Sequence, residues 1–218
     1  MTLPLFGVFG ASGCGSGIMP LLRAQLQGIA SNEQIVFIDD APPAKVLNGH
    51  AVLSWTDFLA KPASKRSVAL AIANSVIRES LAQRCQAVGV ELLTVQAANV
   101  VRMDNITMGD GALLSPFVTF TSNIRIGRCF HANLYSYVEH DCVIGDFVTF
   151  APGVKCNGNV HIEDHAYIGT GAILKQGKPG VPLVIGRGAI VGMGAVVTKS
   201  VAPGVTVVGN PARPLVKS

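Results

Sequence analysis

The chain has 218 residues, of which 49% are hydrophobic and 14% are charged, so it can bury one large core or two small ones. The formal net charge is +4 without a long Lys/Arg run, which argues against nucleic-acid binding and leaves small anionic ligands open. No stretch reaches the roughly eighteen uninterrupted apolar residues of a membrane span, so we expect no membrane insertion.

Residues 3–15 are apolar and rich in glycine, but no basic residue precedes them, since the first arginine is Arg23. We therefore expect a strand and a turn here rather than a signal peptide. The five cysteines are an odd number at irregular spacing without a CxxC pair, which favours reduced thiols. A cytoplasmic protein is the expectation.

Residues 1–95 predict strands that alternate with helices, the pattern of a parallel sheet with right-handed crossovers. The expected strands are residues 5–10 (LFGVFG), 35–40 (IVFIDD) and 67–74 (SVALAIAN). The expected helices are residues 18–30 and 76–89.

The remainder of the chain has a different period. A step of six residues from Met108 to Leu174 meets an apolar residue every time, and glycine often follows the repeated position. This period is typical of a parallel β-helix, in which each face takes six residues and three faces complete a coil. Residues eighteen apart then stack, so Ile126, Ile144 and Ile162 predict one buried column.

The period breaks at residues 177–183 (GKPGVPL) and resumes at Ile185. Two prolines and two glycines indicate a loop that leaves the coil, and loops of this kind often carry function.

The stretch YVEHDCVIGDF (137–147) places His140 beside Asp141, near an expected corner of a coil. An imidazole is mostly neutral yet still basic at cellular pH, which suits a general base, and a neighbouring carboxylate stabilises its protonated form. Glu139 flanks the other side, but successive strand side chains point to opposite faces, so it is the weaker partner. A solvated turn histidine is the alternative interpretation.

The turn at residues 10–15 (GASGCG) follows a strand and opens a helix, so its backbone N–H groups can approach a phosphate. With Asp39 after the second strand, this pattern also fits NAD. The domain is too short for the full six-stranded dinucleotide fold, which argues against that cofactor.

The GASG turn, IDD, EHDCVIGDF, the hexapeptides and the closing VVGNPAR together resemble the bacterial nucleotide-amino-sugar N-acetyltransferases of the bacillosamine and perosamine type. These are hexapeptide-repeat acyltransferases, with sialic acid O-acetyltransferases as cousins, and the resemblance covers essentially the whole chain. It implies a Rossmann-like nucleotide-sugar-binding domain over residues 1–95 and a left-handed parallel β-helix over residues 96–218. It also implies a homotrimer that binds acetyl-CoA, as co-substrate, between neighbouring subunits.

The same resemblance implies that His140 is the general base and Asp141 its partner. It implies a nucleotide-sugar site formed by Ser12, Gly13, Cys14, Asp39, Asp40, Ala73 and Asn74. It implies acetyl-CoA contacts at Thr149, Thr170, Gly192, Met193 and Gly194. Relatives often have His where Cys14 stands and Gly where Ala73 stands, so the sugar nucleotide stays open. In the acetyl-CoA site, relatives often have His at position 149, where Thr149 keeps the hydrogen-bonding capacity but not a titratable ring.

A zinc site would be the alternative use of His131, His161 and His165, as in the γ-class carbonic anhydrases that share the β-helix. The spacing of His161 and His165 differs from that of the paired ligands in that class. Cys142 and Cys156 fall in the inward registers and are expected to be core thiols. We therefore expect no metal.

The sequence thus predicts transfer of acetyl from acetyl-CoA to the amino group of a nucleotide-linked amino sugar, with a 4-amino-4,6-dideoxyhexose favoured. The product would enter polysaccharide or glycan biosynthesis. The alternatives are sugar O-acetylation, a metal-dependent hydratase and a non-catalytic nucleotide-sugar-binding protein. The nucleotide, the position of the amine and the acyl length of the donor stay open.

Overall fold

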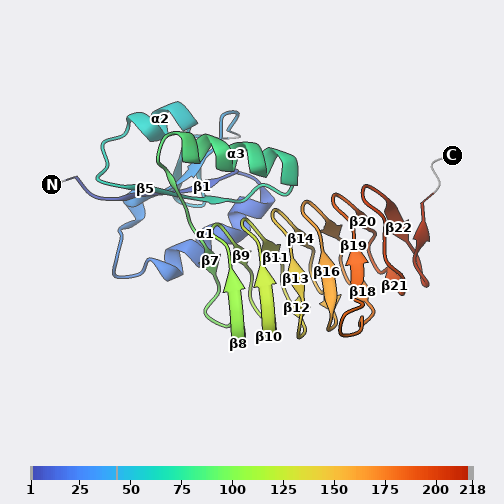
Figure 1. The fold of residues 1–218 in the computed structure, drawn as a ribbon. Helices are drawn as coiled ribbons and strands as arrows, with labels where there is room; N and C mark the ends of the chain where they lie inside the picture. Colours follow the sequence, from blue (N-terminus) through green and yellow to red (C-terminus); the bar gives the residue numbers. More distant parts are fainter. Residues whose placement is uncertain (1, 43, 216–218) are drawn as a thin grey trace. The chain divides into compact units, whose positions relative to one another are not determined.

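The computed structural model describes residues 2–42 and 44–215, which form two compact units, the first ending at Gln96 and the second beginning at Ala97 (Figure 1). The first unit contains all the α-helices of the described residues: α1 (Gly13–Gln25), α2 (Trp55–Ala60) and α3 (Ser75–Ala87), with a short 3-10 helix η1 (Asn32–Gln34). Its strands are β1 (Leu5–Phe9), β2 (Ile35–Ile38), β3 (Val46–Leu47), β4 (His50–Leu53), β5 (Arg66–Leu70), β6 (Glu91–Leu92) and β7 (Val95–Gln96).

Six of these strands form one sheet in the order β3-β4-β2-β1-β5-β6, with every pair parallel except β3 and β4. All residues of β1 and β2 are buried, as expected for strands covered on both faces. Figure 1 shows α2 and α3 on one side of this sheet and α1 on the other. The three strands and two helices expected from the sequence are present. The sheet nevertheless has six strands, more than the length of the domain led us to expect, because the additional strands β3, β4 and β6 have only two, four and two residues.

The carboxyl ends of β1, β2 and β5 lie side by side, because β1 pairs with both of the other two strands. The chain moves from β1 to β2 on one side of β1 and later adds β5 on the other side. The loops that follow β1 and β5 therefore meet at the position where ligands bind in open parallel sheets.

The second unit consists of short strands that follow one another along a single axis (Figure 1). They are β8 (Val101–Met108), β9 (Leu113–Leu114), β10 (Thr119–Ile126), β11 (His131–Ala132), β12 (Tyr137–Val138), β13 (Val143–Ile144), β14 (Thr149–Phe150), β15 (Lys155–Cys156), β16 (Val160–Ile162), β17 (Tyr167–Ile168), β18 (Ile173–Leu174), β19 (Leu183–Ile185), β20 (Ile190–Val191), β21 (Val196–Val197), β22 (Thr206–Val208) and β23 (Arg213–Pro214).

Strand pairing divides these coils into three faces. Face A consists of the first half of β10 with β12, β15, β18 and β21. Face B consists of the second half of β10 with β13, β16 and β19. Face C consists of β9, β11, β14, β17, β20 and β22. The predicted parallel β-helix is therefore present. Each corner takes its name from the two faces that it joins: corner AB joins face A to face B, corner BC joins face B to face C, and corner CA joins face C to face A.

The sequence builds these corners with a regular backbone device. From residue 105 to residue 171, every sixth residue has a positive φ between 50° and 78°. Such left-handed positions favour Gly, Asn and Asp, since other side chains pay a steric cost there. They turn the chain from one flat face to the next at each corner.

The core of the second unit is the set of stacked hydrophobic columns inside the coils. Ile126 pairs with Ile144 and Ile144 with Ile162, and all three are buried, which confirms the predicted column. Ile185 extends it by one coil. The expected loop lies between β18 and β19, where Lys178 and Val181 form an antiparallel bridge across the turn Pro179-Gly180.

Candidate active site

The candidate active site is built on corner AB, between β12 and β13. His140 Nδ1 lies 2.8 Å from Asp141 Oδ2, and both side chains are about half exposed. Asp141 occupies the left-handed position of this corner, with φ of 58°. The turn directs both side chains out of the core, and the structure thus brings the predicted pair into contact.

The imidazole ring lies against the backbone of the next coil. A Cβ added to Gly158 would lie 2.6 Å from both Cε1 and Nε2 of His140 and 3.0 Å from Nδ1. Only glycine leaves room for the ring at this position. Gly158 was not predicted from the sequence. It stands eighteen residues, one coil, after His140, so the repeat could have identified it as a neighbour of the ring.

Asp141 is held as a carboxylate. The hydrogen bond with His140, followed by one from Asn123, lowers the pKa of Asp141 below its ordinary value. Since a carboxylate only accepts hydrogen bonds, Nδ1 of His140 is the donor in the pair, and in the neutral ring Nε2 then has the free lone pair. This tautomer has the basic nitrogen directed away from Asp141.

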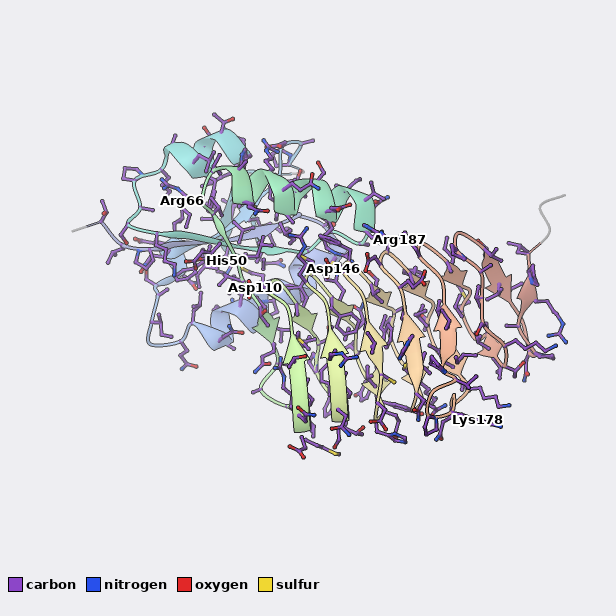
Figure 2. The ribbon with its side chains drawn as sticks, viewed as in Figure 1. His50, Arg66, Asp110, Asp146, Lys178 and Arg187 are labelled. Atoms are coloured by element: carbon purple, nitrogen blue, oxygen red, sulfur yellow. The ribbon has the colours of Figure 1, made fainter. Side chains whose placement is uncertain are left out.

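The insertion loop lies on the same corner. Gly177 N donates to Gly158 O, and Leu183 N donates to Asn159 O, so the loop begins and ends on the coil that follows His140. Figure 2 shows Lys178 at the lower edge of the β-helix, whereas Asp146 and Arg187 lie at the upper edge. The insertion loop is thus adjacent to the coil corner that carries the candidate base.

Cys142 and Cys156 lie inside the core next to this corner, both fully buried, which confirms the expected core thiols. Cys142 Sγ contacts Asn157 O at 3.3 Å. The hydrogen bond with Cys142 and the burial of its sulfur raise the pKa of Cys156. Within residues 2–42 and 44–215, no three His, Cys, Asp or Glu side chains form a group able to hold a metal ion.

Four of the five predicted acetyl-CoA residues gather on corner CA. Gly194 N donates to Thr170 O at 2.8 Å, and the exposed Met193 stands beside it next to Gly192. Thr149 is separate, because it lies within β14 on face C and is buried. A pocket of about 430 Å³ opens at the last coils, with Lys199 and Arg213 among its lining residues.

Corner CA and corner AB are one face apart in the chain. Six residues of extended chain at roughly 3.3 Å each separate the two corners by up to roughly 20 Å. His140 and Thr170 therefore lie on different corners of the β-helix, at opposite edges of face A.

The predicted nucleotide-sugar residues all lie in the first unit, at the carboxyl ends of β1, β2 and β5. Ser12 is the N-cap residue of α1, and Gly13 and Cys14 form its first turn. Burial raises the pKa of the Cys14 thiol, against the lowering effect of the Arg78 charge. Ala73 and Asn74 follow β5, and the Asn74 side chain caps α3 by accepting from two backbone N–H groups.

The two aspartates have different roles in this unit. Asp39 accepts hydrogen bonds from Ala11 N and Ala41 N, both at 3.0 Å, so it fixes the turn after β1. Asp40 accepts from Trp55 N and pairs with Arg84 at 3.0 Å, and the Trp55 bond lowers its pKa. Both carboxylates thus already accept hydrogen bonds from residues of the first unit.

None of the helices in the described part of the chain has the length and apolar character needed to cross a membrane. No family model matches the chain.

Comparison with known proteins gives full-length relatives. The chain is 53% identical over 215 residues to a GDP-perosamine N-acetyltransferase of Escherichia coli O157:H7. This match covers 98% of this chain and 97% of that protein. It is 62% identical to the solved structure of WeeI from Acinetobacter baumannii AYE, with a TM-score of 0.95 over 97% of this chain and 100% of that one. The acetyltransferase domain of PglB from Neisseria gonorrhoeae FA1090, solved in complex with acetyl coenzyme A, is 28% identical with a TM-score of 0.85 over 99% and 100% of the two chains.

The second unit is built of eighteen-residue coils, and together with these similarities it defines the chain as a hexapeptide-repeat acyltransferase. Within that class, the chain belongs to the family of bacterial nucleotide-amino-sugar N-acetyltransferases. The family indicated by the sequence is thereby confirmed.

Proposed function

We propose that this protein transfers the acetyl group of acetyl-CoA to the amino group of GDP-perosamine, a GDP-linked 4-amino-4,6-dideoxyhexose. The observation that carries the proposal is the full-length 53% identity to an enzyme of that name, combined with a His–Asp pair at 2.8 Å on a coil corner. The identity supports GDP as the nucleotide, which the sequence left open. The product would supply polysaccharide or glycan biosynthesis.

In the proposed reaction His140 is the general base. Its Nε2 accepts a proton from the sugar amine as the nitrogen attacks the thioester carbonyl carbon, so an N–C bond forms. The C–S bond then breaks, and the CoA thiolate leaves and takes up a proton. Asp141 holds the Nδ1–H and stabilises the imidazolium that forms, and a positioned base of this kind contributes roughly 10²–10⁴-fold.

The separation of the two corners supports a homotrimer of left-handed β-helices. Corner AB of one copy, with His140, would face corner CA of its neighbour, with Thr170 and residues 192–194. Acetyl-CoA would lie between them, with its carbonyl oxygen stabilised by backbone N–H groups and its phosphates near Lys199 and Arg213. Neither corner would form a complete site in a single copy.

The first unit would be a Rossmann-like domain that binds the nucleotide sugar. Backbone N–H groups at Ser12, Gly13 and Cys14 start α1 and suit a diphosphate, because a helix N-terminus favours anions. Asn74 lies in the facing loop at the point where the strand order reverses. Asp39 would act mainly by fixing the first of these loops.

None of the five cysteines, all of which lie in the described part of the chain, forms a disulfide, which supports a reducing, cytoplasmic setting where acetyl-CoA is available.

The test is an acetyl-transfer assay read by mass spectrometry, since five thiols would disturb a thiol dye. The purified protein is supplied with acetyl-CoA and with GDP-, UDP- and dTDP-linked 4-amino-4,6-dideoxy sugars, and with sialic acid as a hydroxyl acceptor. The proposal expects GDP-perosamine to become heavier by one acetyl group faster than any other acceptor. Acetylation of sialic acid alone, or of none of the acceptors, would overturn it.

A further inference from the structure

A ladder of polar side chains climbs corner AB and ends on the candidate base. Asn105 Nδ2 donates to Asn123 Oδ1 at 2.9 Å, and Asn123 Nδ2 donates to Asp141 Oδ1 at 3.1 Å. The other carboxylate oxygen of Asp141 contacts His140 Nδ1 at 2.8 Å. Each asparagine thus stands one coil before the group it contacts, and the ladder leads to the imidazole.

The direction of the ladder follows from chemistry. An ionised carboxylate only accepts hydrogen bonds, so Asn123 must turn its NH₂ toward Asp141. Its carbonyl oxygen then faces the preceding coil, where Asn105 must donate in turn. A hydrogen bond to a charged acceptor is stronger than one between neutral groups, so the rung between Asn123 and Asp141 is the strong one.

The backbone does not by itself demand these amides. Corner AB carries asparagine or aspartate at its left-handed positions in four successive coils: Asn105, Asn123, Asp141 and Asn159. The matching positions of the other two corners are held by glycines and by other residue types: Phe117, Cys129, Tyr135, Phe147 and His165. Since the same turn accepts aromatic and thiol side chains, a positive φ does not explain why this corner uses amides.

A comparison with corner BC separates the two uses of polar corner residues. There, Asp146 accepts from Arg128 N and Asp164 accepts from Asp146 N, so these carboxylates bond the backbone and stabilise the coil. On corner AB the bonds of Asn105 and Asn123 join side chain to side chain.

We propose that Asn123 is a positioning residue for acetyl transfer, whose amide fixes the Asp141 carboxylate so that the other oxygen faces the His140 imidazole. The inference rests on the proposed function and names a residue that acts on the base through Asp141. With the carboxylate held at both oxygens, His140 keeps the tautomer in which Nε2 is the free base. Asp104, two coils before His140, and Glu139 are the other acidic groups of this corner, and neither holds Asp141 by a hydrogen bond.

The test compares the wild type with Asn123→Gly and the matched control Asn105→Gly. Both changes remove one amide from a left-handed position that glycine adopts freely, so both carry a similar cost in stability. We expect Asn123→Gly to lower kcat about five- to twentyfold with the KM of both substrates unchanged, since about one hydrogen bond to a charged group is lost. Asn105→Gly leaves the bond to Asp141 and should keep kcat within about twofold.

A second variant changes the sign of the interaction. Asn123→Asp places a carboxylate against Asp141. This added negative charge favours protonation of the pair formed by His140 and Asp141. The acidic limb of the pH–kcat profile should move to higher pH in Asn123→Asp, whereas loss of packing alone would leave it in place. Equal loss in Asn123→Gly and Asn105→Gly, or an unmoved acidic limb, would overturn the inference.

A measurement without substrate separates this inference from the proposed function. Ring ¹⁵N NMR of His140, assigned by its disappearance in His140→Asn, reports the fraction of the Nδ1–H tautomer. We expect that fraction to fall in Asn123→Gly and to stay at the wild-type level in Asn105→Gly. An unchanged tautomer in Asn123→Gly would refute the positioning role even if no acceptor were found, whereas the expected shift with an inactive wild type would refute the proposed function alone.

Discussion

The position of the His140 ring against Gly158 allows the geometry of the general base to be tested without substituting His140 itself. In Gly158→Ala, the new Cβ would lie 2.6 Å from Cε1 and Nε2 of His140. Ordinary contacts between such atoms are about 3.5–4.0 Å, so the ring must retreat by about 1 Å. A displacement of that size in a reacting group can cost about 10²-fold in rate.

The fold should accept the change, because Gly158 does not lie among the glycines with positive φ and His140 is half exposed. The ring can swing toward solvent, so we expect little change in the melting temperature. The KM of each substrate should also stay close to the wild-type value, since Gly158 is proposed to act only through the ring. The loss should therefore appear in kcat, by about 10- to 100-fold.

Steady-state kinetics by mass spectrometry, with melting temperatures measured in parallel, provide the assay. Gly17→Ala is the matched control, since a Cβ there meets no atom within 4 Å and its φ is ordinary. A fully active, folded Gly158→Ala would show that the ring position seen here does not matter for turnover and would refute the reasoning.

Three further changes probe other parts of the account. Ile144→Ala, in the middle of the buried isoleucine column, should lower the free energy of unfolding by about 2–5 kcal/mol in urea titrations, and a loss below 1 kcal/mol would contradict the stacked core. Asp39→Ala removes the acceptor of two loop N–H groups and should raise the KM for the nucleotide sugar by roughly tenfold with kcat nearly unchanged; a loss confined to kcat would place Asp39 elsewhere in the mechanism. Because His140 and Asn123 lower the pKa of Asp141, its stabilising effect is complete above the ordinary carboxyl pKa and is lost as the pH falls through the lowered value. The melting temperature of Asp141→Asn should therefore lie below that of the wild type near neutral pH, and the difference should vanish in acid; a difference independent of pH would contradict this.

Much of the second unit could be predicted because its contacts repeat. A step of six gives the faces and a step of eighteen gives the neighbours in space, so the isoleucine column followed directly from the sequence. The same step would have led to Gly158 and Asn123, which stand one coil after His140 and one coil before Asp141. They were missed because the reasoning followed apolar residues, whereas these contacts join a glycine and an amide to polar groups.

The first unit was harder to predict in detail. The turn Asn48-Gly49, a strong hairpin signal, joins β3 to β4, and α2 begins at the capping residue Ser54, yet neither element was expected. Both are too short to show a hydrophobic period. The engagement of Asp40 by Arg84 and Trp55 also depends on segments far apart in the sequence, which no local pattern reveals.

The most direct test of the central claim is the rate of acetylation of GDP-perosamine by the wild type and by His140→Ala, at saturating acetyl-CoA. The account predicts a wild-type product heavier by one acetyl group and a turnover reduced by roughly 10²–10⁴-fold in the variant, which should remain folded. A variant that turns over at the wild-type rate would remove His140 from the mechanism. A wild type that acetylates no nucleotide amino sugar would contradict the proposed function itself.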